Sequence, residues 1–185
     1  MAKENPLASN LTLEQQKNLF GNAYLNMLWH CPTDQRFPYW VHLPDCYYDE
    51  KDPHYKLLVI IHGTGCAVED YVRHAKELAD RDHVAVLAPL FPGGLIQRDD
   101  FNSYKLLSCD GVRYDQILLD MIDDMAKRYP GVETDKFFLF GHSGGGQFVN
   151  RFLFAHPEKL RACAIGAPGR PTFLNPDEDY FWGTR

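Results

Sequence analysis

One serine flanked by glycines carries the strongest chemical signal in the sequence. The segment Gly141–Gly145 reads GHSGG and lies between an apolar run and a helical pattern, with Ser143 at its centre. A G-x-S-x-G sequence in this position is typical of a nucleophile elbow, a sharp turn that lifts the serine hydroxyl above the edge of a sheet. Glycine is needed on both sides because side chains there would collide with neighbouring backbone. The pattern predicts that Ser143 is a catalytic nucleophile beside the positive end of the following helix.

A plainer interpretation of the same segment needs no catalysis. A glycine-rich turn between a strand and a helix can use its serine only to cap the first helical amides. The nucleophile is favoured over the cap because a second motif upstream supplies a matching part of a catalytic site.

This second motif follows the apolar run Leu57–Ile61 and reads HGTG over His62–Gly65. In a strand–turn–helix architecture such a loop faces the serine turn across the top of the sheet, and its backbone N–H groups complete an oxyanion hole. We expect Gly144 to donate one N–H and Thr64 the other, with Gly65 as the alternative to Thr64. The simpler interpretation is a tight turn that needs glycine only for its backbone angles.

A base for this serine is missing from the sequence. His156 is the last histidine of the chain, and at 1.5 Å per residue it would lie roughly 18–20 Å from Ser143 along the nucleophile helix. The side chain of His142 should point away from the site, and His62 fits a structural partner of its own loop. The other histidines are expected in loops or on solvated faces, and they are His30, His42, His54, His74 and His83. The sequence therefore predicts an incomplete triad.

The elements that position these motifs alternate along the chain. Short apolar runs are typical of strands buried on both faces, and the runs are Leu57–Ile61, Val84–Ala88, Phe137–Phe140 and Ala162–Ala167. Between and after them, helical spacing predicts helices around Tyr71–Ala79, Leu118–Tyr129 and Phe148–Ala155. The alternation predicts an α/β fold with a mostly parallel sheet, helices on both faces and the site at the carboxyl ends of the strands.

The first third of the chain is less regular. Leu13–Leu28 has helical spacing, with Thr12 as a possible cap. Phe37–Leu43 is predicted as an edge strand because Pro38 and Pro44 limit its pairing. Further on, a connection of about twenty residues from Phe91 to Asp110 is longer than compact domains usually contain, and we expect it to overhang the site.

Three segments together resemble a known superfamily. Tyr39–Pro44 resembles an early strand ending in proline, Ile61–Gly65 an oxyanion loop and Gly141–Gly145 an elbow of the α/β-hydrolase superfamily. Within it, the sequence is most similar to the serine esterases that include polyhydroxybutyrate depolymerases and feruloyl or acetyl xylan esterases. The resemblance covers about 130 of the 185 residues, from Phe37 to Ala167. It implies cleavage of a carboxylic ester through an acyl intermediate on Ser143, and neither a metal nor an organic cofactor is implied.

The sequence departs from this superfamily after the nucleophile helix. Only Arg161–Ala167 follows as a clear strand, so the α/β-hydrolase-type sheet is expected to lack its last strands and to leave an apolar edge open. Asp177 and Asp179 come where a minority of the superfamily places its acid, and they are otherwise solvated loop charges. A second polypeptide or a missing C-terminal segment should then supply the histidine and the acid.

The chain is expected to have three parts. Residues 1–35 form an N-terminal helical segment that packs on the domain, residues 36–167 form the α/β-hydrolase core, and residues 168–185 form a loop or the start of a lid. The length suits one domain of ordinary size with a full hydrophobic core.

Composition narrows the class of protein. A net charge of −6 without a stripe of Lys and Arg argues against nucleic-acid binding. The sequence shows neither a membrane-spanning apolar segment nor a secretory signal, and its scattered cysteines favour a reduced, cytoplasmic setting without a membrane partner. A leader peptide that has been removed is the alternative. The five cysteines are odd in number and form no CxxC pair, which argues against a zinc site and a disulfide framework.

Two functions of other classes compete with ester hydrolysis. A nucleotide-binding module would have a glycine where Val68 stands and an acid where the next strand ends in Ala88-Pro89. A catalytically inactive hydrolase-fold scaffold explains the missing base but has no use for a strained turn. If the chain is an enzyme, its partner is a small-molecule ester, and the aromatic residues in Phe91–Asp110 and Pro171–Trp182 favour an apolar or aromatic one.

Overall fold

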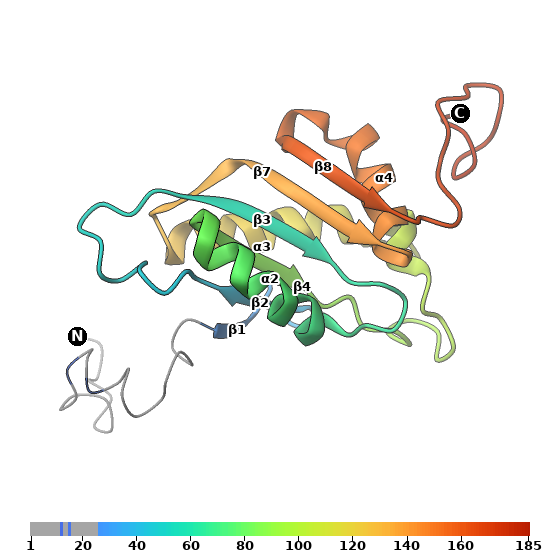
Figure 1. The fold of residues 1–185 in the computed structure, drawn as a ribbon. Helices are drawn as coiled ribbons and strands as arrows, with labels where there is room; N and C mark the ends of the chain where they lie inside the picture. The colour runs from blue at the N-terminus through green and yellow to red at the C-terminus, as the bar shows by residue number, and fades with distance from the viewer. Residues whose placement is uncertain (1–11, 13–14, 16–25) are drawn as a thin grey trace.

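The computed structural model describes residues 12, 15 and 26–185, which form a six-stranded sheet with helices on both faces (Figure 1). The strands lie in the order β1-β2-β4-β3-β7-β8. Their bounds are Asn26–His30 for β1, Pro38–His42 for β2, Tyr55–Ile61 for β3, Val84–Pro89 for β4, Val132–His142 for β7 and Leu160–Gly166 for β8. A separate short hairpin consists of β5 (Ser108–Cys109) and β6 (Val112–Arg113).

The strands β4, β3, β7 and β8 are parallel, and they contain the four apolar runs that the sequence predicts as strands. β1 and β2 extend the sheet beside β4 in antiparallel pairing. The predicted α/β fold with a mostly parallel sheet is therefore confirmed. Because the parallel strands run the same way, their carboxyl ends meet at one edge of the sheet, toward which the arrowheads of β3, β7 and β8 point in Figure 1.

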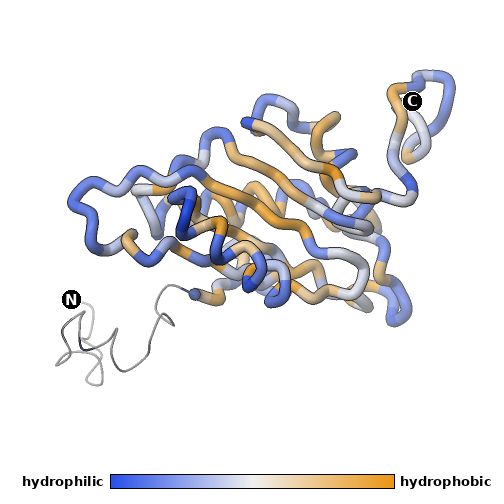
Figure 2. The backbone as a smooth tube through the Cα atoms, viewed as in Figure 1, coloured by the Kyte–Doolittle hydropathy of each residue, from blue (hydrophilic) through white to orange (hydrophobic). Residues whose placement is uncertain are grey.

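Three helices cover the sheet where the sequence predicts them, and they are α2 (Val68–Asp82), α3 (Tyr114–Arg128) and α4 (Gly144–Ala155). α3 and α4 pack on one face through side chains that include Leu118, Met121, Phe148 and Phe152. α2 packs on the other face through Val68, Val72 and Ala79. Figure 2 shows the central strands mainly as hydrophobic and the loop that leads into β3 as hydrophilic. Burial on both faces explains why the strands read as continuous apolar runs.

The predicted helix Leu13–Leu28 is wrong at its C-terminal end. Asn26–His30 is strand β1, which pairs along its whole length with β2. Pairing with a neighbouring strand therefore outweighs the local helical spacing. Thr12 and Gln15 exchange hydrogen bonds as a capping pair does, Thr12 N to Gln15 Oε1 at 2.8 Å and Gln15 N to Thr12 Oγ1 at 3.2 Å. The rest of that predicted helix lies outside the described residues.

The strand predicted over Phe37–Leu43 is present as β2, but its predicted edge position is wrong. β2 lies between β1 and β4, and Pro38 is only its first residue, where a missing N–H interrupts little of the ladder. The Pro38 carbonyl still accepts a hydrogen bond from the Leu90 N–H at 2.8 Å, and Pro44 lies beyond the strand. β1 forms this edge of the sheet instead.

Strand β8 forms the other edge, as predicted. In the part of the chain that the structure describes it pairs only with β7, and Ala162 and Ala164 on it are exposed. The following residues 168–185 contain no helix or strand, and the Tyr180 hydroxyl ties them to the body of the fold by donating to Leu106 O at 2.5 Å. Among residues 26–185, no helix has the length and apolar character needed to cross a membrane.

Candidate active site

Ser143 lies in a sharp turn between β7, which ends at His142, and α4, which begins at Gly144. Its backbone angles are φ 55° and ψ −115°, a combination that residues with a side chain rarely adopt. The Ser143 N–H donates to Gly166 O on β8 at 2.9 Å, and its carbonyl accepts from the Gln147 N–H at 3.1 Å. The residue itself is exposed. The surrounding elements thus hold an accessible hydroxyl in a strained conformation, which is a feature of functional sites.

The glycines around this turn have no room for a side chain. A Cβ atom at Gly141 would lie 2.3 Å from Gly145 O, and a Cβ atom at Gly145 would lie 2.2 Å from Ile61 O. A Cβ atom at Gly146 would lie 2.6 Å from Gly166 O. Such separations are well inside van der Waals contact, so the expected collision of flanking side chains with backbone is confirmed.

The loop His62–Gly65 faces this turn across the top of the sheet, as the sequence predicts. A Cβ atom at Gly63 would lie 3.8 Å from Ser143 Cβ, and a Cβ atom at Gly144 would lie 2.9 Å from Thr64 Oγ1. Within residues 26–185, the N–H groups of Thr64, Gly65 and Gly144 donate to no backbone carbonyl. These are the amides that the sequence analysis assigns to an oxyanion hole, and that role stays a prediction.

His62 is fully buried and serves the loop, as expected. Its Nε2 accepts a hydrogen bond from the Phe91 N–H at 3.0 Å, so the ring proton is on Nδ1, which donates to Gly63 O at 2.6 Å. Burial lowers the pKa of His62, and the nearby charge of Lys105 also lowers it, which keeps the ring neutral. Because both ring nitrogens are engaged, His62 anchors the loop and is not free to act as a base.

Two buried side chains that the sequence analysis did not identify support the same loop. The 3-10 helix η2 (Ser103–Leu106), within the long connection after β4, brings Tyr104 and Lys105 to the site. The Tyr104 hydroxyl donates to His62 O at 3.1 Å, and Lys105 Nζ donates to Thr64 Oγ1 at 2.8 Å. Burial lowers the pKa of Lys105. The unusual length of this connection was its only signal in the sequence.

No hydrogen bond among residues 26–185 joins a histidine to the Ser143 hydroxyl. His156 Nε2 lies 2.9 Å from Asp115 Oδ2 and so is engaged at the far end of α4. His42 Nδ1 lies 2.8 Å from Asn26 Oδ1, and the ring is fully buried. The expectation of a solvated position for His42 is wrong, because β2 is an inner strand and α2 lies against the ring, with Asp80 Oδ1 3.4 Å from His42 Nε2. The incomplete triad stays a prediction.

The two acids proposed from the sequence are surface charges. Asp179 is exposed and forms an ion pair with Arg185, with 2.8 Å between Oδ1 and Nε. Asp177 is exposed as well. Neither has a hydrogen bond to a histidine in residues 26–185, so both fit the interpretation as solvated loop charges.

Solved structures with the same arrangement of strands and helices include three hydrolases. The first is LpqC, a poly(3-hydroxybutyrate) depolymerase from Bordetella parapertussis, with 20% identity, coverage of 95% of this chain and 62% of that chain, and a TM-score of 0.68. The second is poly(aspartic acid) hydrolase-1 from Sphingomonas sp. KT-1, with 19% identity, coverage of 86% and 62%, and a TM-score of 0.67. The third is FphF, a fluorophosphonate-binding serine hydrolase of Staphylococcus aureus, with 22% identity, coverage of 76% and 55%, and a TM-score of 0.61.

These similarities show that the chain has the α/β-hydrolase fold, as the motifs predicted. The chain spans less than two thirds of the length of each of these structures. No family model matches the sequence, and no curated protein matches it either.

Proposed function

We propose that this chain is the nucleophile-bearing part of a serine hydrolase that cleaves carboxylic esters. The observation that carries the proposal is the exposed Ser143 at φ 55°, facing a loop whose amides have no backbone partner among the described residues. The solved structures of the same fold support it, because those named above are a depolymerase of a polyester and other hydrolases.

The reaction proceeds in two acyl-transfer steps. In the first, Ser143 Oγ loses its proton to a base and bonds to the ester carbonyl carbon, and the base then protonates the departing alcohol as the C–O bond breaks. The carbonyl oxygen carries negative charge in between and accepts hydrogen bonds from the N–H groups of Gly144 and Thr64, with Gly65 as the alternative. Each such donor contributes about 3–4 kcal/mol to the transition state. Water then releases the acid by the same route in the second step.

The base and its acid come from outside the described residues in this proposal. A second polypeptide, or a further segment of the chain, supplies a histidine within about 2.6–3.2 Å of Ser143 Oγ. Two observations support this source: no histidine of residues 26–185 is bonded to Ser143, and β8 leaves an edge at which further strands can pair. The substrate proposed is a small apolar or aromatic ester.

A covalent probe tests the nucleophile. A fluorophosphonate reagent should label the native protein only at Ser143, and Ser143→Ala should abolish both the label and ester hydrolysis. Ser108→Ala is the matched control, because Ser108 is also exposed but lies in the short strand β5. Label on another serine, or full activity in Ser143→Ala, would contradict the proposal.

Added imidazole tests the missing base separately. The 185-residue chain alone should hydrolyse aryl esters orders of magnitude more slowly than a complete triad does, and imidazole should raise the rate. Imidazole also attacks aryl esters directly, so the rate measured with Ser143→Ala is subtracted. Ordinary enzymatic rates without imidazole would assign the base to this chain or a second copy of it. A lack of rescue would favour the inactive scaffold.

A further inference from the structure

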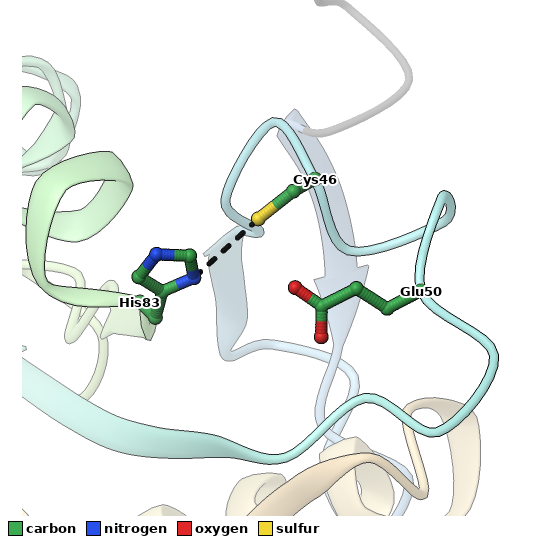
Figure 3. Close-up of side chains that lie close together, drawn as sticks. All are labelled: Cys46, Glu50 and His83. Atoms are coloured by element: carbon green, nitrogen blue, oxygen red, sulfur yellow. Dashed lines mark hydrogen bonds between the residues drawn. The ribbon is translucent and has the colours of Figure 1, made fainter.

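Three side chains able to bind a metal meet at the amino ends of the parallel strands. Cys46 and Glu50 belong to the loop between β2 and β3, and His83 lies between α2 and β4 (Figure 3). In Figure 1 this β2–β3 loop projects from the end of the sheet opposite to the arrowheads of β3 and β7. The cluster is therefore at the other end of the molecule from Ser143 and has no part in the proposed ester hydrolysis.

The separations within the cluster fit one small cation. One ligand atom from each of Cys46, Glu50 and His83 lies within 4.8 Å of the other two, and Cys46 Sγ lies 3.5 Å from His83 Nδ1. Zinc bonds of about 2.3 Å to sulfur and about 2.05 Å to nitrogen, at a tetrahedral angle, place the two ligand atoms about 3.6 Å apart. The sulfur and the nitrogen are thus already at the required separation. The exposed Glu50 carboxylate lies within 4.8 Å of both atoms.

His83 occupies a backbone position that usually belongs to glycine. It follows the last turn of α2 with φ 53° and ψ 56°, and its N–H donates to Ala79 O. A left-handed conformation is unfavourable for a residue with a Cβ atom. In this conformation the ring of His83 points toward Cys46 (Figure 3).

Cys46 is held from two sides. The Tyr47 N–H donates to Pro44 O and the Asp49 N–H donates to Cys46 O, both at 2.9 Å, so two successive turns surround the cysteine. The hydroxyl of the buried Tyr55 lies 3.1 Å from Cys46 Sγ. Such a contact orients a metal ligand from behind.

The types of donor select the metal. Thiolate and imidazole are preferred by Zn²⁺, whereas Mg²⁺ and Ca²⁺ take oxygen ligands. Figure 3 shows the Cys46 sulfur and the Glu50 carboxylate on the same side of the His83 ring, so the two converge with Nδ1 on one point. A catalytic relay would place the carboxylate on the other ring nitrogen. The arrangement therefore fits a metal site better than a second nucleophile.

We propose that Cys46, Glu50 and His83 bind Zn²⁺, with a water molecule as the fourth ligand. On binding, the Cys46 thiol releases its proton to solvent and the sulfur bonds to the ion. The ion then links the β2–β3 loop to the end of α2. The sequence analysis expected no zinc site because the cysteines form no CxxC pair, but these ligands include one cysteine only and meet through the fold.

Cobalt gives the direct test, because Co²⁺ occupies tetrahedral zinc sites and absorbs light. Titration of the reduced full chain with Co²⁺ should produce a sulfur-to-cobalt charge-transfer band that equimolar Zn²⁺ removes. Cys46→Ser should abolish the band. Asparagine tolerates the left-handed backbone, so His83→Asn should still fold. It should weaken Co²⁺ binding at least about tenfold, because even the loss of a contact that only orients a metal ligand lowers metal affinity by about that factor. Cys109→Ser and His54→Asn, a cysteine and a nearby histidine outside the cluster, should change nothing.

A measurement on the unchanged chain tests the site even if the variants fail to fold. Equimolar Zn²⁺ should slow the alkylation of Cys46 at least about tenfold and leave the rates at Cys109 and Cys163 unchanged, as peptide mass spectrometry reports. Equal protection of all three cysteines, no protection of Cys46, or a cobalt band that survives Cys46→Ser would overturn the proposal. The cluster would then be a set of hydrogen bonds. None of these results depends on whether Ser143 cleaves esters.

Discussion

The two ends of the sheet carry two sites that are built in different ways. At the carboxyl ends of the strands, the site consists of two short contiguous segments. Its defining features are backbone angles, glycines without room for a Cβ atom and amides that have no backbone partner among residues 26–185. At the amino ends, the cluster joins Cys46 and His83, which are 37 residues apart, through side chains alone. A site made of backbone leaves a motif in the sequence, whereas a site made of converging side chains leaves none.

The largest expected effect concerns the glycines of the carboxyl-end site. Gly145→Ala places a Cβ atom 2.2 Å from Ile61 O, a backbone atom that cannot move away as a side chain can. The free energy of unfolding should therefore fall by about 3 kcal/mol or more. Gly65→Ala is the matched control, because a Cβ atom there meets nothing within 4 Å. Urea denaturation measures both. Equal stability of the two variants would mean that the carboxyl-end site does not depend on close backbone packing.

The next effect separates backbone from side chain within the oxyanion loop. Thr64→Pro deletes the Thr64 N–H and should lower kcat on the order of a hundredfold in the complete enzyme. Thr64→Ser keeps both the N–H and the hydroxyl that accepts from Lys105 Nζ, so it should retain most of the activity. Melting temperatures of both variants show whether folding is intact. If Thr64→Ser lost as much activity as Thr64→Pro, the amide would not be the working group.

A smaller effect is expected on the pH dependence of stability. It involves two buried histidines, His62 near the carboxyl ends of the strands and His42 on β2, nearer the other end. Burial lowers the pKa of each below its usual 6.5, so the unfolded chain takes up the proton first. The stability that each contributes is complete above about pH 6.5 and is lost as the pH falls through that value toward the lower folded pKa. Asp80, 3.4 Å from His42 Nε2, favours the protonated ring there, whereas Lys105 opposes it at His62.

His62 should therefore account for more of the loss than His42. The free energy of unfolding is measured at intervals between about pH 7 and 5. Its decrease with falling pH should be reduced more by His62→Gln than by His42→Gln. Gln keeps an acceptor and a donor but does not titrate in this range. A steeper loss assigned to His42 would show that Asp80 does not offset the burial of its partner.

The smallest expected effect lies at the amino ends. His83→Gly removes the cost of a left-handed residue with a Cβ atom but adds the backbone entropy of glycine, so the metal-free stability should change by less than about 1 kcal/mol. The same change should abolish the increase in melting temperature that Zn²⁺ produces in the unchanged chain. A large loss of metal-free stability would show that His83 supports the fold itself, and that this end too depends on local packing.

Local patterns predicted most of the fold. The four apolar runs became the parallel strands, because a strand buried on both faces is apolar at every position. The three helical stretches became α2, α3 and α4, because a helix that buries one stripe repeats its apolar residues at helical spacing. The same reasoning failed where the partner decided the outcome. Asn26–His30 joins the sheet because β2 is available to pair with it, and β2 becomes an inner strand for the same reason.

The sequence by itself determined the turn at Ser143, since its demands fall on adjacent residues and a Cβ atom at Gly141, Gly145 or Gly146 would collide with backbone atoms. The facing loop was predicted from its place directly after an apolar strand. Tertiary structure alone decided which side chains support them, as with Lys105 on Thr64, and which meet far away, as with Cys46 and His83. A side chain reaches partners that are distant along the chain only after the strands have been ordered. Because that order depends on long-range pairing, no spacing in the sequence records it.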